Sequence, residues 1–164
     1  MKCVFLDRDG VLNVDRGTYS WAEDHFKILP KVPETLIALK SRGFLLVVVT
    51  NQAGIAKGLY TGAEVLQCHE RLQAASNRSL DDIFYSPHHP SVSESISRKP
   101  NSLLLERAIS KFKVTVEESW MIGDKQRDIT PAQNLGLKTI LVGPEKSTAD
   151  YTVEKTEQIL QHII

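Results

Sequence analysis

The chain has 164 residues, of which 41% are hydrophobic and 24% are charged, so we expect one globular domain spanning residues 1–164. Twenty basic and twenty acidic residues give a formal net charge of zero, which argues against an overall field that attracts nucleic acid or membranes. The two cysteines, Cys3 and Cys68, lie in apolar contexts and are too few for a disulfide framework. No apolar run is long enough to cross a bilayer, and we expect a cytoplasmic protein.

The first stretch, residues 2–6, is almost continuously apolar, which is typical of a strand buried on both faces of a parallel sheet. Asp7, Asp9 and Gly10 follow, and a glycine lets the backbone turn and expose the two carboxylates. Carboxylates this close repel each other unless a cation lies between them, and Mg²⁺ is a hard cation that prefers oxygen ligands. The pattern therefore indicates a magnesium site for phosphate chemistry. The alternative interpretation of the same residues is an ordinary Asp-Gly turn.

Strand and helix patterns alternate along the rest of the chain. We expect further strands at residues 44–49, 82–85, 119–122 and 139–142, and helices at residues 32–42, 61–72, 105–112, 130–135 and 153–164. Thr61 and Glu64 have capping-box spacing, and Pro131 suits the first turn of the fourth helix. Residues 14–29 have no period and are predicted to form a loop over the strand end, in which Trp21 is a packing anchor more than a ligand contact.

This alternation predicts an α/β doubly wound parallel sheet, in which the carboxyl ends of the strands meet at one edge. The polar residues that we expect at this edge are Asp7, Asp9, Thr50, Asn51, Lys99, Asp124 and Asp128. Phosphoryl transfer needs a nucleophile, a metal, and cationic or hydroxyl donors around the phosphoryl oxygens. A carboxylate can act as the nucleophile through an aspartyl-phosphate, and a neighbouring carboxyl can act as general acid and base.

The chain resembles the haloacid dehalogenase (HAD) superfamily of phosphatases, whose four motifs are similar to Asp7-Arg8-Asp9-Gly10, Thr50, Lys99, and Gly123-Asp124 with Asp128. The resemblance implies that Asp7 is the nucleophile and Asp9 the general acid/base. It also implies that Asp7, the carbonyl of Asp9 and Asp124 hold Mg²⁺, while Thr50 and Lys99 bind the phosphate and Asp128 supports the site. No separate cap domain fits between the motifs, so we expect an open site whose loops choose the substrate.

Finer details resemble one subgroup, the D-glycero-D-manno-heptose 1,7-bisphosphate phosphatases and the related histidinol-phosphate phosphatases. The similar stretches are residues 5–14, 47–58, 87–90, 98–100 and 123–125. This implies a small phosphorylated metabolite as the substrate, with a sugar phosphate as the first choice and histidinol phosphate as the second. Asn51 and Arg98 become candidate phosphate- or substrate-binding residues. Lys125 is either a supporting residue or a solvated surface charge.

One departure from the subgroup lies in the loop before Lys99. The subgroup carries a structural zinc site there with the pattern Cys-x-His and Cys-x-Cys, whereas this chain has Ser86-Pro87-His88 and Ser95-Ile96-Ser97. Serine hydroxyls do not replace thiolates at a tetrahedral zinc site, so we predict no structural zinc. The loop is then held by hydrogen bonds and packing, or it is mobile. His88 and His89 are relics of a metal site, surface residues or substrate contacts.

Two functions of other classes compete with a phosphatase. A signalling receiver domain also uses acidic residues, Mg²⁺, Thr and Lys, but it accepts phosphate on an Asp after its third strand, where this chain has Tyr85 and Ser86. A phosphate-binding scaffold without turnover is disfavoured because every catalytic position is filled. Neither a P-loop nor a dinucleotide-binding glycine pattern occurs. We expect no nucleic-acid or membrane partner, and a monomer is favoured.

Overall fold

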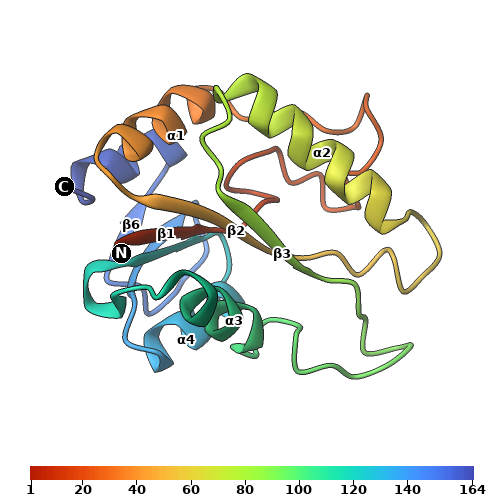
Figure 1. Cartoon of the computed structure of the whole chain (residues 1–164). Helices are drawn as coiled ribbons and strands as arrows, with labels where there is room; N and C mark the ends of the chain where they lie inside the picture. The colour runs from red at the N-terminus through yellow and green to blue at the C-terminus, as the bar shows by residue number, and fades with distance from the viewer.

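A six-stranded parallel sheet runs through the computed structural model, which describes residues 1–164 (Figure 1). Its strands, in the spatial order β3-β2-β1-β4-β5-β6, are β1 (Cys3–Leu6), β2 (Leu45–Asn51), β3 (Asp82–Ser86), β4 (Trp120–Gly123), β5 (Lys138–Val142) and β6 (Tyr151–Val153). All five neighbouring pairs are parallel. The first strand of the sequence therefore lies inside the sheet, and the direction of winding reverses beside it. The predicted α/β doubly wound parallel sheet is confirmed.

Helices cover both faces of this sheet (Figure 1). On one face lie α1 (Val32–Ser41), α2 (Gly62–Ala75) and the 3₁₀ helix η2 (Thr156–Gln161); on the other lie α3 (Leu103–Phe112) and α4 (Gln126–Asn134). A short 3₁₀ turn, η1 (Val116–Glu118), precedes β4. The helix that begins near Thr61 is confirmed, and the Thr61 backbone N–H donates to Glu64 Oε2 at 2.8 Å as a capping box requires.

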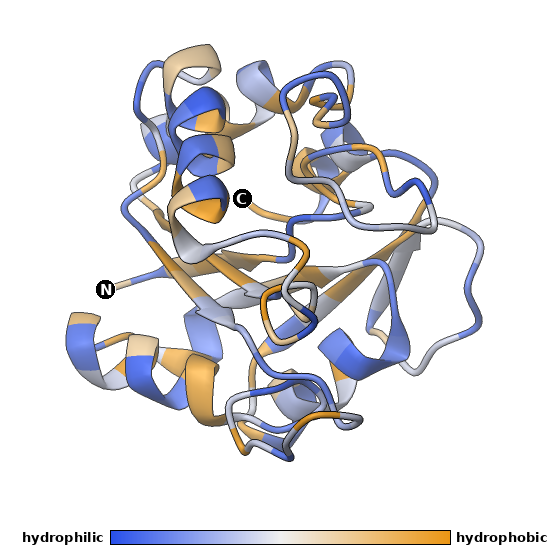
Figure 2. Ribbon diagram, turned by 90° about the vertical axis from the view of Figure 1, so that its right-hand side faces the viewer, coloured by the Kyte–Doolittle hydropathy of each residue, from blue (hydrophilic) through white to orange (hydrophobic).

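The core is divided into two apolar clusters by the sheet. Side chains alternate along β1, so that Val4 and Leu6 join the larger cluster under α1 and α2, whereas Cys3 and Phe5 join the smaller cluster under α3 and α4. All four are fully buried, as predicted for a strand that is covered on both faces. Figure 2 shows the strands as mostly hydrophobic segments and much of the loop backbone as hydrophilic.

Two predicted elements are wrong in part. The fourth helix begins at Gln126, with Pro131 in its interior. In its first turn, the Asp128 carboxylate accepts the Lys125 backbone N–H at 3.1 Å. This cap stabilises the start of the helix, whereas Pro131 removes only one backbone hydrogen bond from its interior. The C-terminal tail is not one helix, because residues 151–153 form the edge strand β6 before η2.

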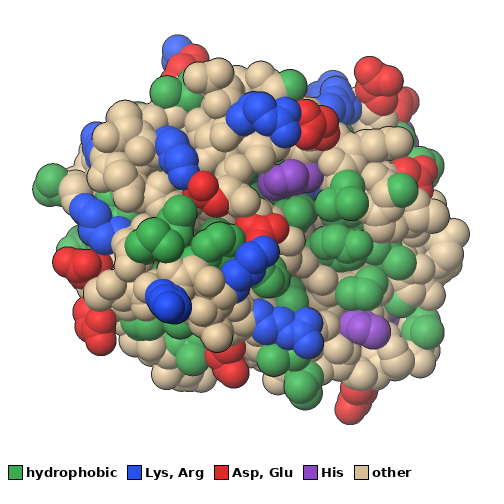
Figure 3. Space-filling view, viewed as in Figure 1, with side chains coloured by type: hydrophobic (Ala, Val, Ile, Leu, Met, Phe, Trp, Pro, Cys, Tyr) green, Lys and Arg blue, Asp and Glu red, His purple; other side chains and the backbone are tan.

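The surface carries charges of both signs. In the view of Figure 3, basic and acidic side chains are interspersed, with apolar groups between them. No helix reaches the length and apolar character that a membrane crossing requires.

Candidate active site

The predicted site residues converge at the carboxyl edge of the sheet. Asp7 follows β1, Thr50 and Asn51 end β2, and Asp124 follows β4. Lys99 reaches the same place from the loop before α3, and Asp128 from the first turn of α4. The four charged side chains, Asp7, Lys99, Asp124 and Asp128, are almost completely buried. Such burial of charge is tolerated only where the groups are paired or bind an ion.

Lys99 is the buried cation of this cluster. Its Nζ lies 2.8 Å from Asp7 Oδ1 and 2.6 Å from Asp128 Oδ1, and it donates to the Val49 carbonyl at 2.8 Å. Burial alone lowers the pKa of Lys99, but the carboxylates of Asp128 and Asp7 outweigh it, so that the pKa is raised. Asn51 fixes the backbone of Lys99 through two hydrogen bonds. Its Oδ1 accepts the Lys99 N–H at 3.0 Å, and its Nδ2 donates to the Lys99 carbonyl at 3.2 Å.

The three carboxylates offer a place for a cation. Oxygens of Asp7, Asp124 and Asp128 lie within 4.8 Å of one another, and Asp124 Oδ1 is buried without any hydrogen-bond partner. Burial, followed by the charges of Asp7 and Asp128, raises the pKa of Asp124 to about 7. Both Asp128 oxygens are already occupied, one by Lys99 and one by the Lys125 N–H. The residues therefore fit a hard divalent cation, with Asp7 and Asp124 as its available carboxylates.

Gly10 makes this arrangement possible. Its φ is +88°, a left-handed conformation that side chains disfavour, and a Cβ at this position would lie 2.4 Å from Asp124 Oδ2. The turn after β1 and the loop after β4 can approach each other only because position 10 has no side chain. This turn was predicted from the sequence, whereas the close approach of Asp124 was not.

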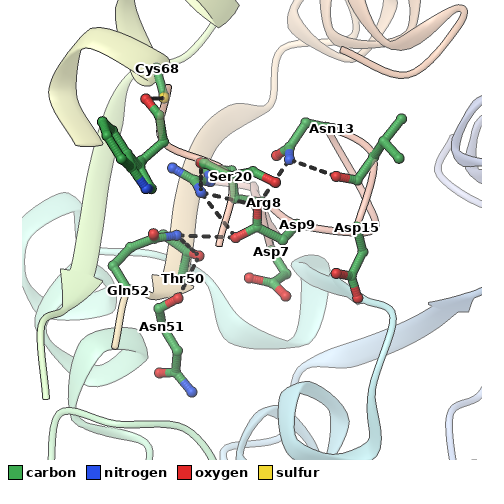
Figure 4. A network of polar contacts seen from close by, with 12 residues as sticks. Asp7, Arg8, Asp9, Asn13, Asp15, Ser20, Thr50, Asn51, Gln52 and Cys68 are labelled. Atoms are coloured by element: carbon green, nitrogen blue, oxygen red, sulfur yellow. Dashed lines mark hydrogen bonds and ion pairs between the residues drawn. The ribbon is translucent and has the colours of Figure 1, made fainter. Parts of the chain in front are cut away.

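Asp9 lies beside this cluster in a separate hydrogen-bond network (Figure 4). Its carboxylate accepts Arg8 Nη2 at 3.0 and 3.1 Å, Asn13 Nδ2 at 2.9 Å and Gln52 Nε2 at 3.2 Å. Arg8 is buried and also donates to the Ser20 carbonyl at 2.8 Å, which ties the loop of residues 14–29 to Asp9. Sequence reasoning missed Arg8, Asn13 and Gln52 as site residues. The signal that could have found Gln52 is its place directly after Thr50 and Asn51 at a buried strand end.

A cavity of about 520 Å³ opens beside Asp9. Its lining includes two carboxylates, Asp9 and Asp15, which are outnumbered by four cations, Lys57, Arg98, Lys125 and Arg127; Asn51, Gln52, Tyr19 and His89 also line it. Burial, and then the charge of Arg127, lowers the pKa of Arg98. Lys57 and Arg127 were not predicted, because they come from a loop and a helix whose relation to the cavity depends on the folded chain. Such a cavity suits an anionic ligand.

The loop before Lys99 is held by a chain of serine hydroxyls. Ser97 Oγ lies 2.9 Å from Ser86 Oγ and 2.9 Å from Ser95 Oγ, and Arg98 Nη1 donates to the His88 carbonyl at 3.2 Å. These are the positions at which cysteines stand in the subgroup that the sequence resembles. Of the two expected candidates, His89 lines the 520 Å³ cavity and His88 does not.

Comparisons with known proteins agree with this geometry. The HAD-hydrolase-like family matches residues 96–163. The D-glycero-β-D-manno-heptose-1,7-bisphosphate 7-phosphatase of Haemophilus ducreyi is 34% identical, over 99% of this chain and 94% of that protein. The enzyme of the same name from Escherichia coli K12 is 37% identical, over 98% of this chain and 92% of that protein.

Solved structures show the same fold. The D,D-heptose 1,7-bisphosphate phosphatase from B. bronchiseptica, complexed with magnesium and phosphate, superposes with a TM-score of 0.85 at 28% identity, covering 99% of both chains. A putative HAD-like phosphatase from Mesorhizobium loti superposes with a TM-score of 0.85 at 24% identity, covering 99% of this chain and 86% of that chain. Both the resemblance to HAD phosphatases and the expectation of an enzyme are confirmed. Identity above 30% over nearly the whole chain shows that this protein belongs to the HAD-type heptose-1,7-bisphosphate phosphatase family.

Proposed function

We propose that this protein hydrolyses the 7-phosphate of D-glycero-D-manno-heptose 1,7-bisphosphate through an aspartyl-phosphate on Asp7, with Mg²⁺ as cofactor. The observation that carries the proposal is the buried cluster of Lys99, Asp7 and Asp124, which lies beside a cation-lined cavity. The names and coverage of the relatives support the substrate. The magnesium and phosphate in the B. bronchiseptica complex support the cofactor.

Two steps account for the hydrolysis. In the first, an Asp7 oxygen forms a bond to phosphorus, the bond from phosphorus to the sugar oxygen breaks, and the Asp9 carboxyl gives its proton to that leaving oxygen. In the second, the Asp9 carboxylate takes a proton from water, whose oxygen attacks phosphorus, and the bond to Asp7 breaks to release phosphate. General acid/base catalysis of this kind contributes on the order of 10²- to 10⁴-fold in rate.

The remaining residues bind and orient the phosphate. Lys99 holds Asp7 in place through their 2.8 Å ion pair and brings a positive charge to the reacting group. The Thr50 hydroxyl, at the end of β2, is a donor for a phosphoryl oxygen. Mg²⁺, held by Asp7, Asp124 and the carbonyl of Asp9, would neutralise the phosphoryl charge. Asp128 supports the site by binding Lys99 at 2.6 Å.

The charge of the cavity favours a bisphosphate over histidinol phosphate. A bisphosphate presents a second dianionic group beyond the one that reacts, and Arg98, Arg127 and Lys57 line the cavity that this group would occupy. Histidinol phosphate instead carries an ammonium group away from its phosphate, which is disfavoured because the four cations of the lining outnumber its two carboxylates, Asp9 and Asp15. Lys125 is less free to bind substrate, because its Nζ lies 3.3 Å from Asp124 and 3.5 Å from Glu145.

We also propose that the protein acts as a cytoplasmic monomer with a single domain and without structural zinc. Cys3 and Cys68 are both free and buried, which suits a reducing compartment. Asp7, Lys99 and Asp128 make their ion pairs within one copy of the chain. The serine chain of Ser86, Ser95 and Ser97 supports the proposal that the loop needs no zinc.

The decisive experiment measures phosphate release with Mg²⁺ from heptose 1,7-bisphosphate, histidinol phosphate and simple sugar monophosphates. We expect the highest kcat/KM with the heptose bisphosphate and no detectable release by Asp7→Asn. A higher kcat/KM with histidinol phosphate would overturn the proposed substrate. Equal rates for the wild type and Asp7→Asn would overturn the proposed nucleophile.

A further inference from the structure

Tyr60 is tied to the proposed general acid/base by a buried chain of hydrogen bonds. Its hydroxyl donates to Gln52 Oε1 at 2.7 Å, and Gln52 Nε2 donates to Asp9 Oδ2 at 3.2 Å and to Thr50 Oγ1 at 3.0 Å. Tyr60 is 5% exposed and Gln52 is 2% exposed. One glutamine amide therefore connects the carboxylate that moves the proton with the hydroxyl that binds the phosphate.

The chain fixes which way the Gln52 amide points. An ionised Asp9 carboxylate has no proton, so only the amide NH₂ can make a favourable contact with it. The Tyr60 hydroxyl satisfies the opposite end of the amide, the carbonyl oxygen. Without this hydroxyl, the buried amide oxygen would lack a partner and the amide could turn its carbonyl toward Asp9.

The surroundings hold the Tyr60 ring in one place. It stacks on Trp21 with ring centroids 6.0 Å apart and lies against Tyr19 at 5.9 Å. Gly54 lies directly beside it, since a Cβ there would be 2.1 Å from Tyr60 Cε1. Tyr60 does not line the 520 Å³ cavity, whereas Gln52 and Tyr19 do. A change at the Tyr60 hydroxyl therefore reaches Asp9 without removing a contact with the substrate.

We propose that Tyr60 is a positioning residue, which acts through Gln52 to hold the Asp9 carboxyl where it protonates the leaving oxygen. The proposal rests on the function proposed above for Asp9. It predicts a loss that depends on the leaving group. A sugar alkoxide needs the proton from Asp9 as its bond to phosphorus breaks, whereas p-nitrophenolate leaves without one.

The test compares Tyr60→Phe with the wild type on the heptose bisphosphate and on p-nitrophenyl phosphate. For Tyr60→Phe we expect kcat/KM to fall on the order of 10-fold with the sugar phosphate and by less than about twofold with p-nitrophenyl phosphate. The loss with the sugar phosphate should fall on kcat and leave KM nearly unchanged, because Tyr60 does not line the cavity. Tyr151→Phe, on the exposed edge strand β6, removes a tyrosine hydroxyl far from the site and should match the wild type.

A second variant keeps the test decisive if Tyr60→Phe is unstable. Gln52→Glu retains the acceptor for Tyr60 but removes the amide donor to Asp9, so it should also lose more activity with the sugar phosphate than with p-nitrophenyl phosphate. Equal losses on both substrates would overturn the proposal and leave Tyr60 a packing role only. If the wild type hydrolyses p-nitrophenyl phosphate but not the heptose bisphosphate, the proposed substrate fails. The leaving-group comparison can then still be made with an alkyl phosphate that it does hydrolyse.

Discussion

Lys99 is the residue on which the charge balance of the buried cluster depends. Its ammonium faces Asp7 and Asp128, and the side chains of all three are at least nine-tenths buried. Lys99→Met should abolish phosphate release and lower the free energy of unfolding by about 3 to 5 kcal/mol, because it leaves buried carboxylates without a partner. Urea denaturation at pH 7 measures this loss. The control is Lys111→Met, since Lys111 pairs with Asp82 at the surface and its removal should cost less than about 1 kcal/mol.

The outcome at lower pH separates charge from packing. Burial, followed by the charge of Asp7, raises the pKa of Asp128, so this carboxyl takes up a proton more readily as the pH falls and then no longer needs the ammonium. The destabilisation by Lys99→Met should therefore shrink as the pH is lowered from 7. A loss of stability that does not change with pH would show that the side chain of Lys99 acts through packing alone.

The residues that bear charge were the most predictable part of the site. Asp7, Asp124 and Lys99 stand at strand ends or in loops, where polar residues after an apolar run point to the edge of a parallel sheet. The partners of Asp9 were not predictable in this way. Gln52 and Arg8 are site residues because folding buries both side chains and brings their nitrogens within hydrogen-bond distance of the Asp9 carboxylate. No periodicity in the sequence encodes that distance.

At the scale of elements, the loop of residues 86–97 replaces metal ligation by hydrogen bonds. Ser97 connects Ser86, at the end of β3, with Ser95. We expect that a zinc-selective chelator, with Mg²⁺ present, leaves both the melting temperature and kcat/KM unchanged. Elemental analysis of the purified protein should find less than one tenth of an equivalent of zinc, on the order expected for adventitious binding alone. A stoichiometric zinc content, or a loss of activity with the chelator, would contradict the prediction.

The matched variant is Ser97→Ala, which removes the central hydroxyl of the chain. Each of its two hydrogen bonds is worth about 0.5 to 1.5 kcal/mol, so the variant should be destabilised by roughly 1 to 3 kcal/mol. Ser91→Ala, which removes a single exposed hydrogen bond to His89 in the same loop, is the control. A Ser97→Ala protein as stable as the control would show that packing alone holds the loop.

The elements that sequence reasoning missed lack the signals on which it depends. β6 has three residues and pairs only with β5, which is too short for a strand period to be read. The predicted start of α4 was too late because proline is common in the first turn of a helix, and Pro131 was therefore placed there. The cap formed by Asp128 determines the actual start. The longer elements, such as α2 with its Thr61 cap, had both a period and an end signal.

At the scale of the whole molecule, Mg²⁺ should stabilise the fold because the carboxylates that bind it come from different strands. In the metal-free protein the pKa of Asp124 is raised to about 7, so the folded state keeps a proton that the unfolded chain has already lost. The stability contributed by Asp124 therefore decreases as pH rises toward 7, and Mg²⁺ has to displace a proton below this pH.

The thermal shift caused by Mg²⁺ should consequently increase from pH 5.5 to about pH 7.5 and then level off. Differential scanning calorimetry with and without millimolar Mg²⁺ measures it at each pH. Asp124→Asn should show a much smaller shift without this pH dependence. The prediction fails if the wild type and Asp124→Asn respond equally to Mg²⁺.

The place of β1 in the sheet also affects how the protein is made. β1 leaves the ribosome first, yet one of its two neighbours is β4, which begins at Trp120. Until β4 is synthesised, the edge of β1 that pairs with β4 has no partner. At typical rates of translation this interval lasts on the order of 10 s. A nascent chain of this protein therefore exposes one unpaired edge of an apolar strand during this interval, and such an edge is prone to pair with other chains.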